Sequence, residues 1–152
     1  MNYKILNKKE STKITNDLKE QFGIKDLKLD YGFVQKEDKI FLISKDLAKI
    51  DYTELRINNI GLYFCTLANN GIRLSIEGSQ IIGKKTTKNV VEISNDEVNY
   101  WFNGEALVRK NVSGFVLIKH NNDFLGCGYG KEGLIINYVP KERRVSELIP
   151  LN

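Results

Sequence analysis

The chain has 152 residues, enough for one compact domain of ordinary size or two small domains that share an interface. Its 41% hydrophobic and 28% charged residues are typical of a globular protein and exclude a disordered chain. No apolar run approaches the roughly 20 residues that span a bilayer, and the first residues lack an apolar block of signal-peptide length. We therefore expect a cytoplasmic protein without a membrane partner, and the net charge of +4 favours a polyanionic partner.

Residues that usually carry metal or nucleophilic chemistry are scarce. Cys65 and Cys127 lie in apolar, strand-like segments, so we expect two reduced, buried thiols. His120 is the single histidine, which excludes zinc sites of the usual Cys/His composition. Nothing in the sequence places a nucleophile and an orienting acid beside it, and the carboxylates lack the paired spacing of acid–base catalysis. We expect no catalytic residue, no metal and no cofactor.

The first expected element is an amphipathic helix over residues 8–22. Asn7 and Glu10 have the spacing of a capping box, and Gly23 can take the left-handed conformation that ends a helix. One apolar stripe runs along the helix, formed by Ile14, Leu18 and Phe22.

Short strands are expected to complete an N-terminal domain over residues 1–74. Alternating apolar residues and polar turns indicate these elements. In chain order they are a strand over 27–35, a strand over 40–43, one helical turn at 46–49, strands over 55–57 and 62–65, and an Asn-Gly hairpin turn at 69–71.

Two further helices are expected in a second domain over residues 75–152. The first covers 76–82, with Ser75 as its cap and Gly83 at its end. Within it, Gly78 costs up to ~1 kcal/mol relative to alanine, which indicates close packing or an approaching ligand. After a strand at 90–93, a capping box of Ser94 and Glu97 begins the other helix, which Gly104 stops. Its buried stripe contains Val98, Trp101 and Phe102.

Residues 114–144 are expected to form three strands followed by a basic loop. The strands cover 115–118, 124–130 and 134–136. Glycines at every second position, at 126, 128 and 130, remove the side chains from one face, so something must approach that face or the strand must bend. No Lys-Ser/Thr ending or helix follows them, so they are not a P-loop. The last residues, 145–152, are expected to pack back onto a sheet.

Cationic residues cluster in two loops that lie far apart in the sequence. One holds Lys84, Lys85 and Lys88, and the other holds Lys141, Arg143 and Arg144. Each loop is either a phosphate-binding surface or an exposed, solvated turn. We expect the fold to bring both loops together into one groove for a nucleic-acid strand, with Arg109 and Lys119 widening the patch.

The motifs G-x-V-L-I-K, F-L-G-x-G and N-Y-x-P-K-x-x-R occur at 114–119, 124–128 and 137–144. They resemble the PUA-like RNA-binding module attached to Fmu/Sun-type RNA cytosine methyltransferases. Residues 60–93, which include IRLSIEGSQ, resemble the matching region of archaeal proteins of the NOL/NOP/Fmu ribosome-biogenesis group. This resemblance implies an α+β fold with a small pre-PUA-like domain and a PUA-like β pseudo-barrel. It carries no catalysis, because the methyltransferase region is missing from these residues.

By the same resemblance we expect a protein that binds structured RNA, ribosomal or transfer RNA, in ribosome biogenesis or RNA modification, and not an enzyme. An alternative is an adaptor that recruits a separate RNA-modifying enzyme or assembly factor, through exposed aromatics among Tyr31, Phe33, Tyr52 and Tyr63. An enzyme would instead show a deep pocket with converging carboxylates or His120. The expected RNA contacts are Lys84, Lys85, Lys88, Arg109, Lys119, Asn137, Tyr138, Lys141, Arg143 and Arg144.

Overall fold

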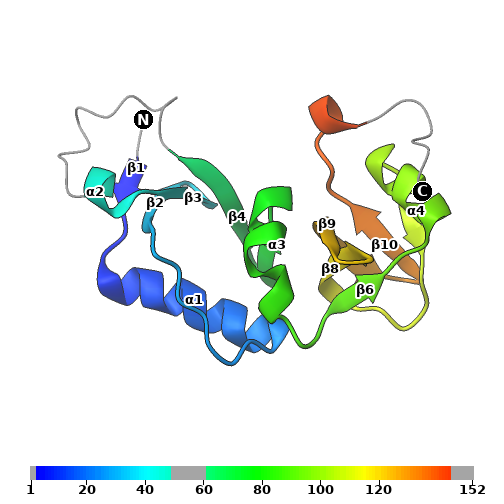
Figure 1. The fold of residues 1–152 in the computed structure, drawn as a ribbon, viewed down its shortest axis with the longest axis horizontal. Coiled ribbons are helices and arrows are strands. Elements are labelled where there is room, and N and C mark those ends of the chain that lie inside the picture. The colour runs from blue at the N-terminus through cyan, green and yellow to red at the C-terminus, as the bar shows by residue number, and fades with distance from the viewer. Residues whose placement is uncertain (1–2, 49–60, 145–152) are drawn as a thin grey trace.

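The computed structural model describes residues 3–48 and 61–144, which form two five-stranded sheets with helices around them (Figure 1). The first sheet is antiparallel throughout and has its strands in chain order. Its strands are β1 (Tyr3–Ile5), β2 (Gly32–Lys36), β3 (Lys39–Ile43), β4 (Leu62–Ala68) and β5 (Gly71–Leu74).

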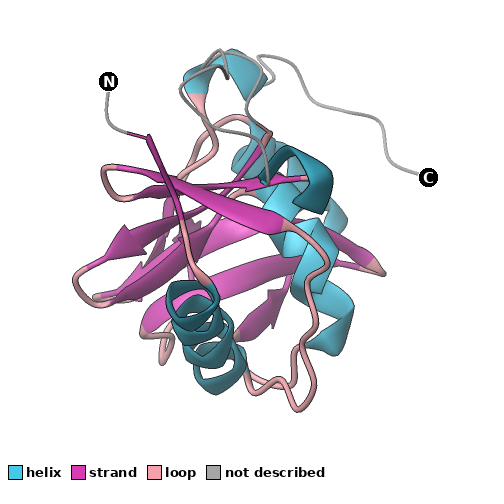
Figure 2. Cartoon of the chain, turned by 90° about the vertical axis from the view of Figure 1, so that its left-hand side faces the viewer, coloured by secondary structure: helices cyan, strands magenta, loops and turns pink. Residues whose placement is uncertain are grey.

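Helix α1 (Lys8–Phe22) packs beneath the first sheet, as Figures 1 and 2 show. The predicted capping box is confirmed, since Asn7 accepts from the Glu10 N–H and the Glu10 carboxylate accepts from the Asn7 N–H. Gly23 takes the left-handed conformation at φ 63°. The helix therefore begins and ends where its local sequence predicts.

The predicted strand over 27–35 is wrong for its first half, because β2 begins only at Gly32. Leu27 and Leu29 pack partly against the core from an irregular segment, so their alternation reflects burial without a strand ladder. The predicted helical turn is α2 (Lys45–Ala48). The predicted strand at 55–57 and the packing of 145–152 lie outside the described residues.

The second sheet has the strand order β6-β8-β9-β10-β7, in which β6 and β8 run parallel and the other neighbours antiparallel. Helix α4 (Asn95–Phe102) begins at the predicted Ser94 capping box. The strands are β6 (Val90–Glu92), β7 (Leu107–Val108), β8 (Gly114–His120), β9 (Asp123–Lys131) and β10 (Leu134–Asn137), and the turn η4 (Lys141–Arg143) follows them.

Helix α3 (Ile76–Ile82) lies between the two sheets and contacts β4 on one side and β9 on the other. A Cβ on Gly78 would lie 2.4 Å from the Phe64 carbonyl oxygen, so of the two expectations for this glycine, close packing is the one found. Gly83 keeps a right-handed conformation and continues into the 3₁₀ turn η3 (Gly83–Lys85). It lies against the Phe124 ring, which leaves no room for a side chain.

One hydrophobic cluster takes side chains from both sheets. Leu18, Phe22 and Phe64 from the N-terminal part pack in the same cluster as Leu117 and Phe124 from the second sheet. This shared core joins the two halves, and the boundary between residues 74 and 75 stays a prediction.

The alternating glycines of β9 are covered by the protein itself. A Cβ on Gly128 would lie 3.0 Å from the Trp101 ring, and one on Gly130 would lie 2.4 Å from the Val112 carbonyl oxygen. Trp101 is fully buried, and its Nε1 donates to the Leu125 carbonyl oxygen at 3.1 Å. The expected close approach to this face is therefore confirmed, and the approaching groups include Ile135, Trp101 and Val112.

Candidate nucleic-acid interface

A basic hollow of about 510 Å³ lies where the loop after α3 meets the β8–β9 turn. Lys84 enters it from η3 and Lys119 from β8, so the fold brings these two predicted residues together. We call this hollow the lysine groove. It is lined by Gly83, Lys84, Thr86, Thr87, Val90, Lys119, Asn122 and Phe124.

The loop that carries the lysines is held by the end of α1. The backbone N–H groups of Thr87 and Lys88 both donate to the Phe22 carbonyl oxygen, at 2.9 and 3.2 Å. The Thr87 hydroxyl donates to the Gly23 carbonyl oxygen, and the Asn89 amide donates to that of Gln21 at 2.6 Å. These bonds satisfy carbonyls that a helix end leaves free, so the loop backbone has a fixed position before any ligand binds.

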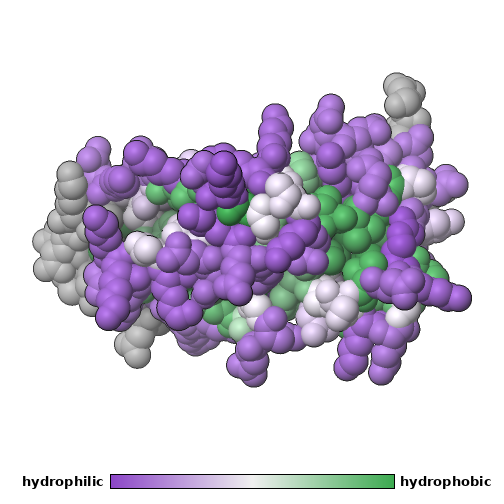
Figure 3. All heavy atoms as spheres, turned by 90° about the horizontal axis from the view of Figure 1, so that it is seen from below, coloured by the Kyte–Doolittle hydropathy of each residue, from purple (hydrophilic) through white to green (hydrophobic). Residues whose placement is uncertain are grey.

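The lysines of this region are not neutralised by acidic side chains of the described residues. Within residues 3–48 and 61–144, no ion pair involves Lys84, Lys85, Lys88 or Lys119. Glu92 stands opposite Lys119 in the sheet register, but its carboxylate accepts from the Asn121 N–H. Seen from below, hydrophilic side chains cover most of the face that carries α1, while apolar ones gather toward the second sheet (Figure 3).

The second cationic loop lies at the opposite end of α3. Arg143 forms an ion pair with Glu77 in the first turn of α3, whereas Lys84 follows the last turn. Seven residues of helical rise separate those positions, about 10 Å. In Figure 1 the turn η4 lies near the top and the loop after α3 at the bottom. The expectation of one groove formed by both loops is therefore wrong.

The other two cations of the second loop, Arg144 and Lys141, differ in their contacts with the protein. Arg144 donates from Nε to the Val139 carbonyl oxygen at 3.0 Å, and its guanidinium packs against Gly104. Lys141 is exposed. Among the three cations of this loop, Lys141 is the one whose side chain makes the fewest of the described contacts.

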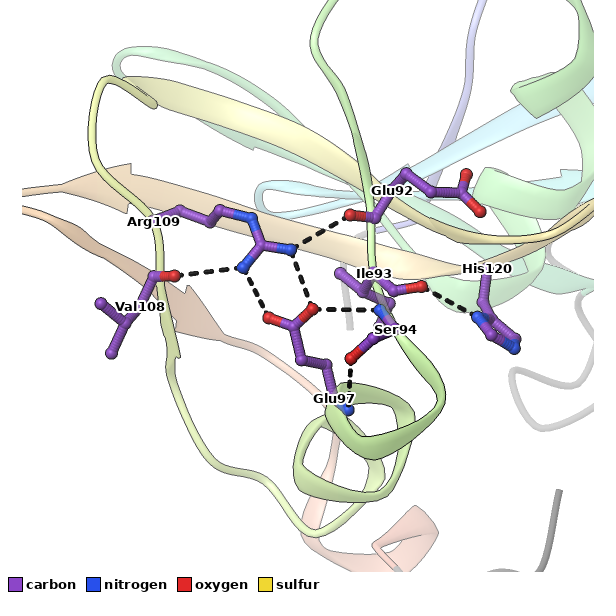
Figure 4. A network of polar contacts seen from close by, with 7 residues as sticks. All are labelled: Glu92, Ile93, Ser94, Glu97, Val108, Arg109 and His120. Atoms are coloured by element: carbon purple, nitrogen blue, oxygen red, sulfur yellow. Dashed lines mark hydrogen bonds and ion pairs between the residues drawn. The ribbon is translucent and has the colours of Figure 1, made fainter.

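Arg109 has a structural role in this fold (Figure 4). Its guanidinium holds Glu97 through two bonds, Nη1 to Oε2 at 2.5 Å and Nη2 to Oε1 at 2.9 Å, and also donates to the Glu92 and Val108 carbonyls. The Arg109 hydrogen bonds lower the pKa of Glu97 to about 2, against the opposing effect of its partial burial. This clamp ties the start of α4 to β6 and β7, and it uses the donors that an RNA phosphate would need.

Asn137 is likewise engaged inside the protein. Its Nδ2 donates to the Trp101 and Glu105 carbonyls at 2.7 and 2.9 Å, and its Oδ1 accepts from the Val139 N–H. The amide therefore connects the end of α4 to β10, which favours a structural role for this predicted RNA contact.

A second hollow, of about 320 Å³, lies between the two sheets at the start of α3. We call it the interdomain cleft. Tyr138 lines it, with the Arg73 guanidinium 4.3 Å from the centre of its ring. The Lys39 ammonium lies similarly over Tyr63, 5.7 Å from the ring centre. The first sheet contributes Lys39, Tyr63 and Arg73, and β9 of the second sheet contributes Gly126 and Cys127. Glu77 comes from α3, and Tyr138 and Arg143 come from the segment after β10.

Sequence reasoning missed two cleft residues, Lys39 and Arg73, and named Tyr63 only for the adaptor function. A signal existed for Arg73, because in the strand after the Asn-Gly turn it alternates with buried Ile72 and Leu74. A cation between two buried neighbours must point to the opposite face of the strand. No local pattern identifies Lys39 or Tyr63 as its neighbours in space.

Two competing functions were considered: an adaptor that uses exposed aromatic residues, and an enzyme that uses His120. Phe33 is buried, Tyr31 is exposed, Tyr63 is half-buried in the cleft and Tyr52 lies outside the described residues, so the adaptor stays a prediction. His120 places Nδ1 at 2.9 Å from the Ile93 carbonyl oxygen, apart from the cleft. The two predicted free, buried thiols are confirmed, and burial raises the pKa of both Cys65 and Cys127 to about 12.

Comparisons with known proteins identify the class of the C-terminal part. Residues 88–145 match the family model for the PUA domain of methyltransferase RsmF. The fold is similar to that of a conserved PUA domain protein from Thermoplasma acidophilum, with a TM-score of 0.60 and 14% identity over 93% of this chain and 96% of that one. At this identity the likeness shows the fold alone. No curated protein matches the chain.

Residues 88–145 are therefore similar to a PUA domain, and the predicted α+β fold with a PUA-like pseudo-barrel is confirmed. PUA domains are RNA-binding modules, so this match supports RNA binding in general. That the chain is not an enzyme stays a prediction. None of the helices in the described ranges has the length and apolar character needed to cross a membrane.

Proposed function

We propose that this protein binds structured RNA, ribosomal or transfer RNA, in ribosome biogenesis or RNA modification. The observation that carries the proposal is a set of lysines without ion-pair partners in the described chain. They are held on a fixed loop beside a region that matches the PUA domain of methyltransferase RsmF. The NOL/NOP/Fmu resemblance of residues 60–93 supports the same role. Cytoplasmic location and an RNA-modifying or assembly partner belong to this proposal.

The proposed contacts divide by chemistry. Lys84, Lys85 and Lys88, which are exposed, and the half-buried Lys119 contact phosphates, because ammonium groups without acidic partners can release counterions when RNA binds. Lys141 and Arg143 lie at or beside the cleft, where Tyr138 is partly exposed and can meet a base or ribose. Phosphate contacts alone give little sequence specificity, so recognition depends on RNA shape.

RNA binding measured against salt tests this function. For wild type we expect the affinity for a structured RNA to fall as salt rises. In Lys84/Lys85/Lys88→Ala the slope of log K against log salt should flatten by roughly 0.7 to 0.9 per lost contact. In Arg143/Arg144→Ala the slope should change less, because Glu77 and the Val139 carbonyl already hold these guanidiniums.

The matched control is Lys9/Lys110/Lys131→Ala, which removes the same charge from exposed positions away from the groove. It should keep the wild-type slope. A lysine-loop variant with the wild-type slope would contradict the phosphate contacts, and a wild-type protein without affinity for any structured RNA would contradict the function.

One observation favours the adaptor as a second candidate. Val108, Leu134 and Ile136 are exposed on the neighbouring strands β7 and β10, with Val108 and Leu134 paired in register. Adjacent exposed apolar residues can form a protein-binding patch. An adaptor that does not itself bind RNA would show no salt-dependent RNA affinity in the experiment above.

A further inference from the structure

The lysine groove lacks a ring on which a base could stack. Its aromatic residue, Phe124, is only 6% exposed. One side of that ring is covered by Gly83, and the Lys119 ammonium lies 5.7 Å from the ring centre. An unpaired base binds proteins largely by stacking on exposed aromatic faces. The groove is therefore suited to phosphates, which lysines hold as point charges.

The interdomain cleft, in contrast to the groove, is lined by aromatic side chains. Tyr63 and Tyr138 line it, and Tyr138 is 36% exposed. Its cations are partly used within the protein, since Arg143 pairs with Glu77 and Arg73 lies over Tyr138. Two surfaces of different chemistry thus occupy the two ends of α3, about 10 Å apart by helical rise.

The backbone of the groove is also fixed in advance. Hydrogen bonds to the last carbonyls of α1 hold Thr87, Lys88 and Asn89, and the Thr86 hydroxyl donates to the Gly83 carbonyl oxygen at 2.6 Å. Lys119 comes from the adjoining strand β8. Two cations whose backbones are held in place by two elements suit a rigid array of phosphates better than a flexible single strand.

We propose that the lysine groove is a separate site for the phosphate backbone of an RNA duplex, with Lys84 and Lys119 on the phosphates and the interdomain cleft free for another part of the same RNA. This inference rests on the proposed function and specifies which RNA form the groove takes. An A-form duplex is recognised mostly through its shape, phosphates and 2′-hydroxyls, for which no stacking ring is needed.

The test compares a blunt RNA duplex of about 16 base pairs, a length typical of duplex-binding domains, with a stem–loop that carries unpaired nucleotides. Binding is measured for wild type, Lys84/Lys119→Gln, the cleft variant Arg73→Gln/Tyr138→Leu, and the control Lys9/Lys131→Gln. Circular dichroism checks that each variant is folded. The groove variant should bind the blunt duplex about tenfold more weakly at ~0.1 M salt, with a slope reduced by about 1 to 2.

The cleft variant and the control should bind the blunt duplex within about twofold of wild type, because neither removes a groove lysine. Wild-type affinity in the groove variant, or loss of duplex binding in the cleft variant, would overturn the inference. If wild type binds the stem–loop and not the blunt duplex, the inference fails and the proposed function stands. If wild type binds neither RNA, both fail.

Discussion

Replacing Trp101 with alanine should lower the free energy of unfolding by about 3–5 kcal/mol, the usual cost of removing a large buried side chain. Trp101 is fully buried and lies against Gly128, a strand position with no room for a Cβ. The space that the indole leaves is bounded by the backbone of Gly128, which has no side chain that could move in to fill it. The loss of the Nε1 bond also leaves the Leu125 carbonyl oxygen without this donor.

Urea unfolding followed by circular dichroism measures this effect, since the variant has lost the only tryptophan and its fluorescence. The control is Tyr100→Ala, the neighbouring aromatic on the exposed side of α4, which should cost well under half as much. Equal losses in the two variants would show that Trp101 is not the central core residue of the second sheet.

Replacing Arg109 with methionine should lower the free energy of unfolding at pH 7 by about 1–3 kcal/mol, the range for hydrogen bonds to charged groups. Glu97 then keeps its Ser94 contacts and loses both guanidinium bonds. Both side chains of the pair are partly shielded from water, with exposed fractions of 31% and 21%. The pair should therefore contribute more than an exposed ion pair does.

The pH dependence of stability gives a sharper readout of the same clamp. Because the pKa of Glu97 is lowered to about 2 in the folded protein, its stabilising effect is present above an unfolded pKa of about 4.3 and is lost as the pH falls toward 2. Arg109→Met should reduce this acid-induced loss, whereas Lys110→Met, an exposed neighbour, should leave it unchanged. An Arg109 variant with wild-type stability and the wild-type pH profile would contradict the clamp.

Elements specified by nearby residues were predictable from the sequence. The capping boxes at Asn7 and Ser94 and the left-handed Gly23 involve groups within three or four positions along the chain, so spacing alone locates them. The first half of the strand predicted over 27–35 is wrong, because Leu27 and Leu29 alternate for burial while the backbone there pairs with no strand. Periodicity reports which side chains face the core, and a ladder also needs a partner strand.

The site was predictable only in part, for the same reason. Lys84, Lys85 and Lys88 form a cluster within five residues of the chain, and a run of charged residues is predicted to be exposed. Their distance from Arg143, however, depends on where α3 lies between the sheets, and the Arg143–Glu77 pair joins residues 66 positions apart. The clamp of Arg109 on Glu97 and the meeting of Arg73 with Tyr138 are also tertiary contacts. No spacing along the chain indicates them.

Backbone amide shifts of the ¹⁵N-labelled protein during titration with a stem–loop RNA test most directly whether RNA contacts both ends of α3. We predict two separate groups of perturbed amides, one at residues 83–88 and 119–124 and the other around the interdomain cleft at 73–77 and 138–143. Perturbations confined to other surfaces, such as α1 and β1, would contradict this account.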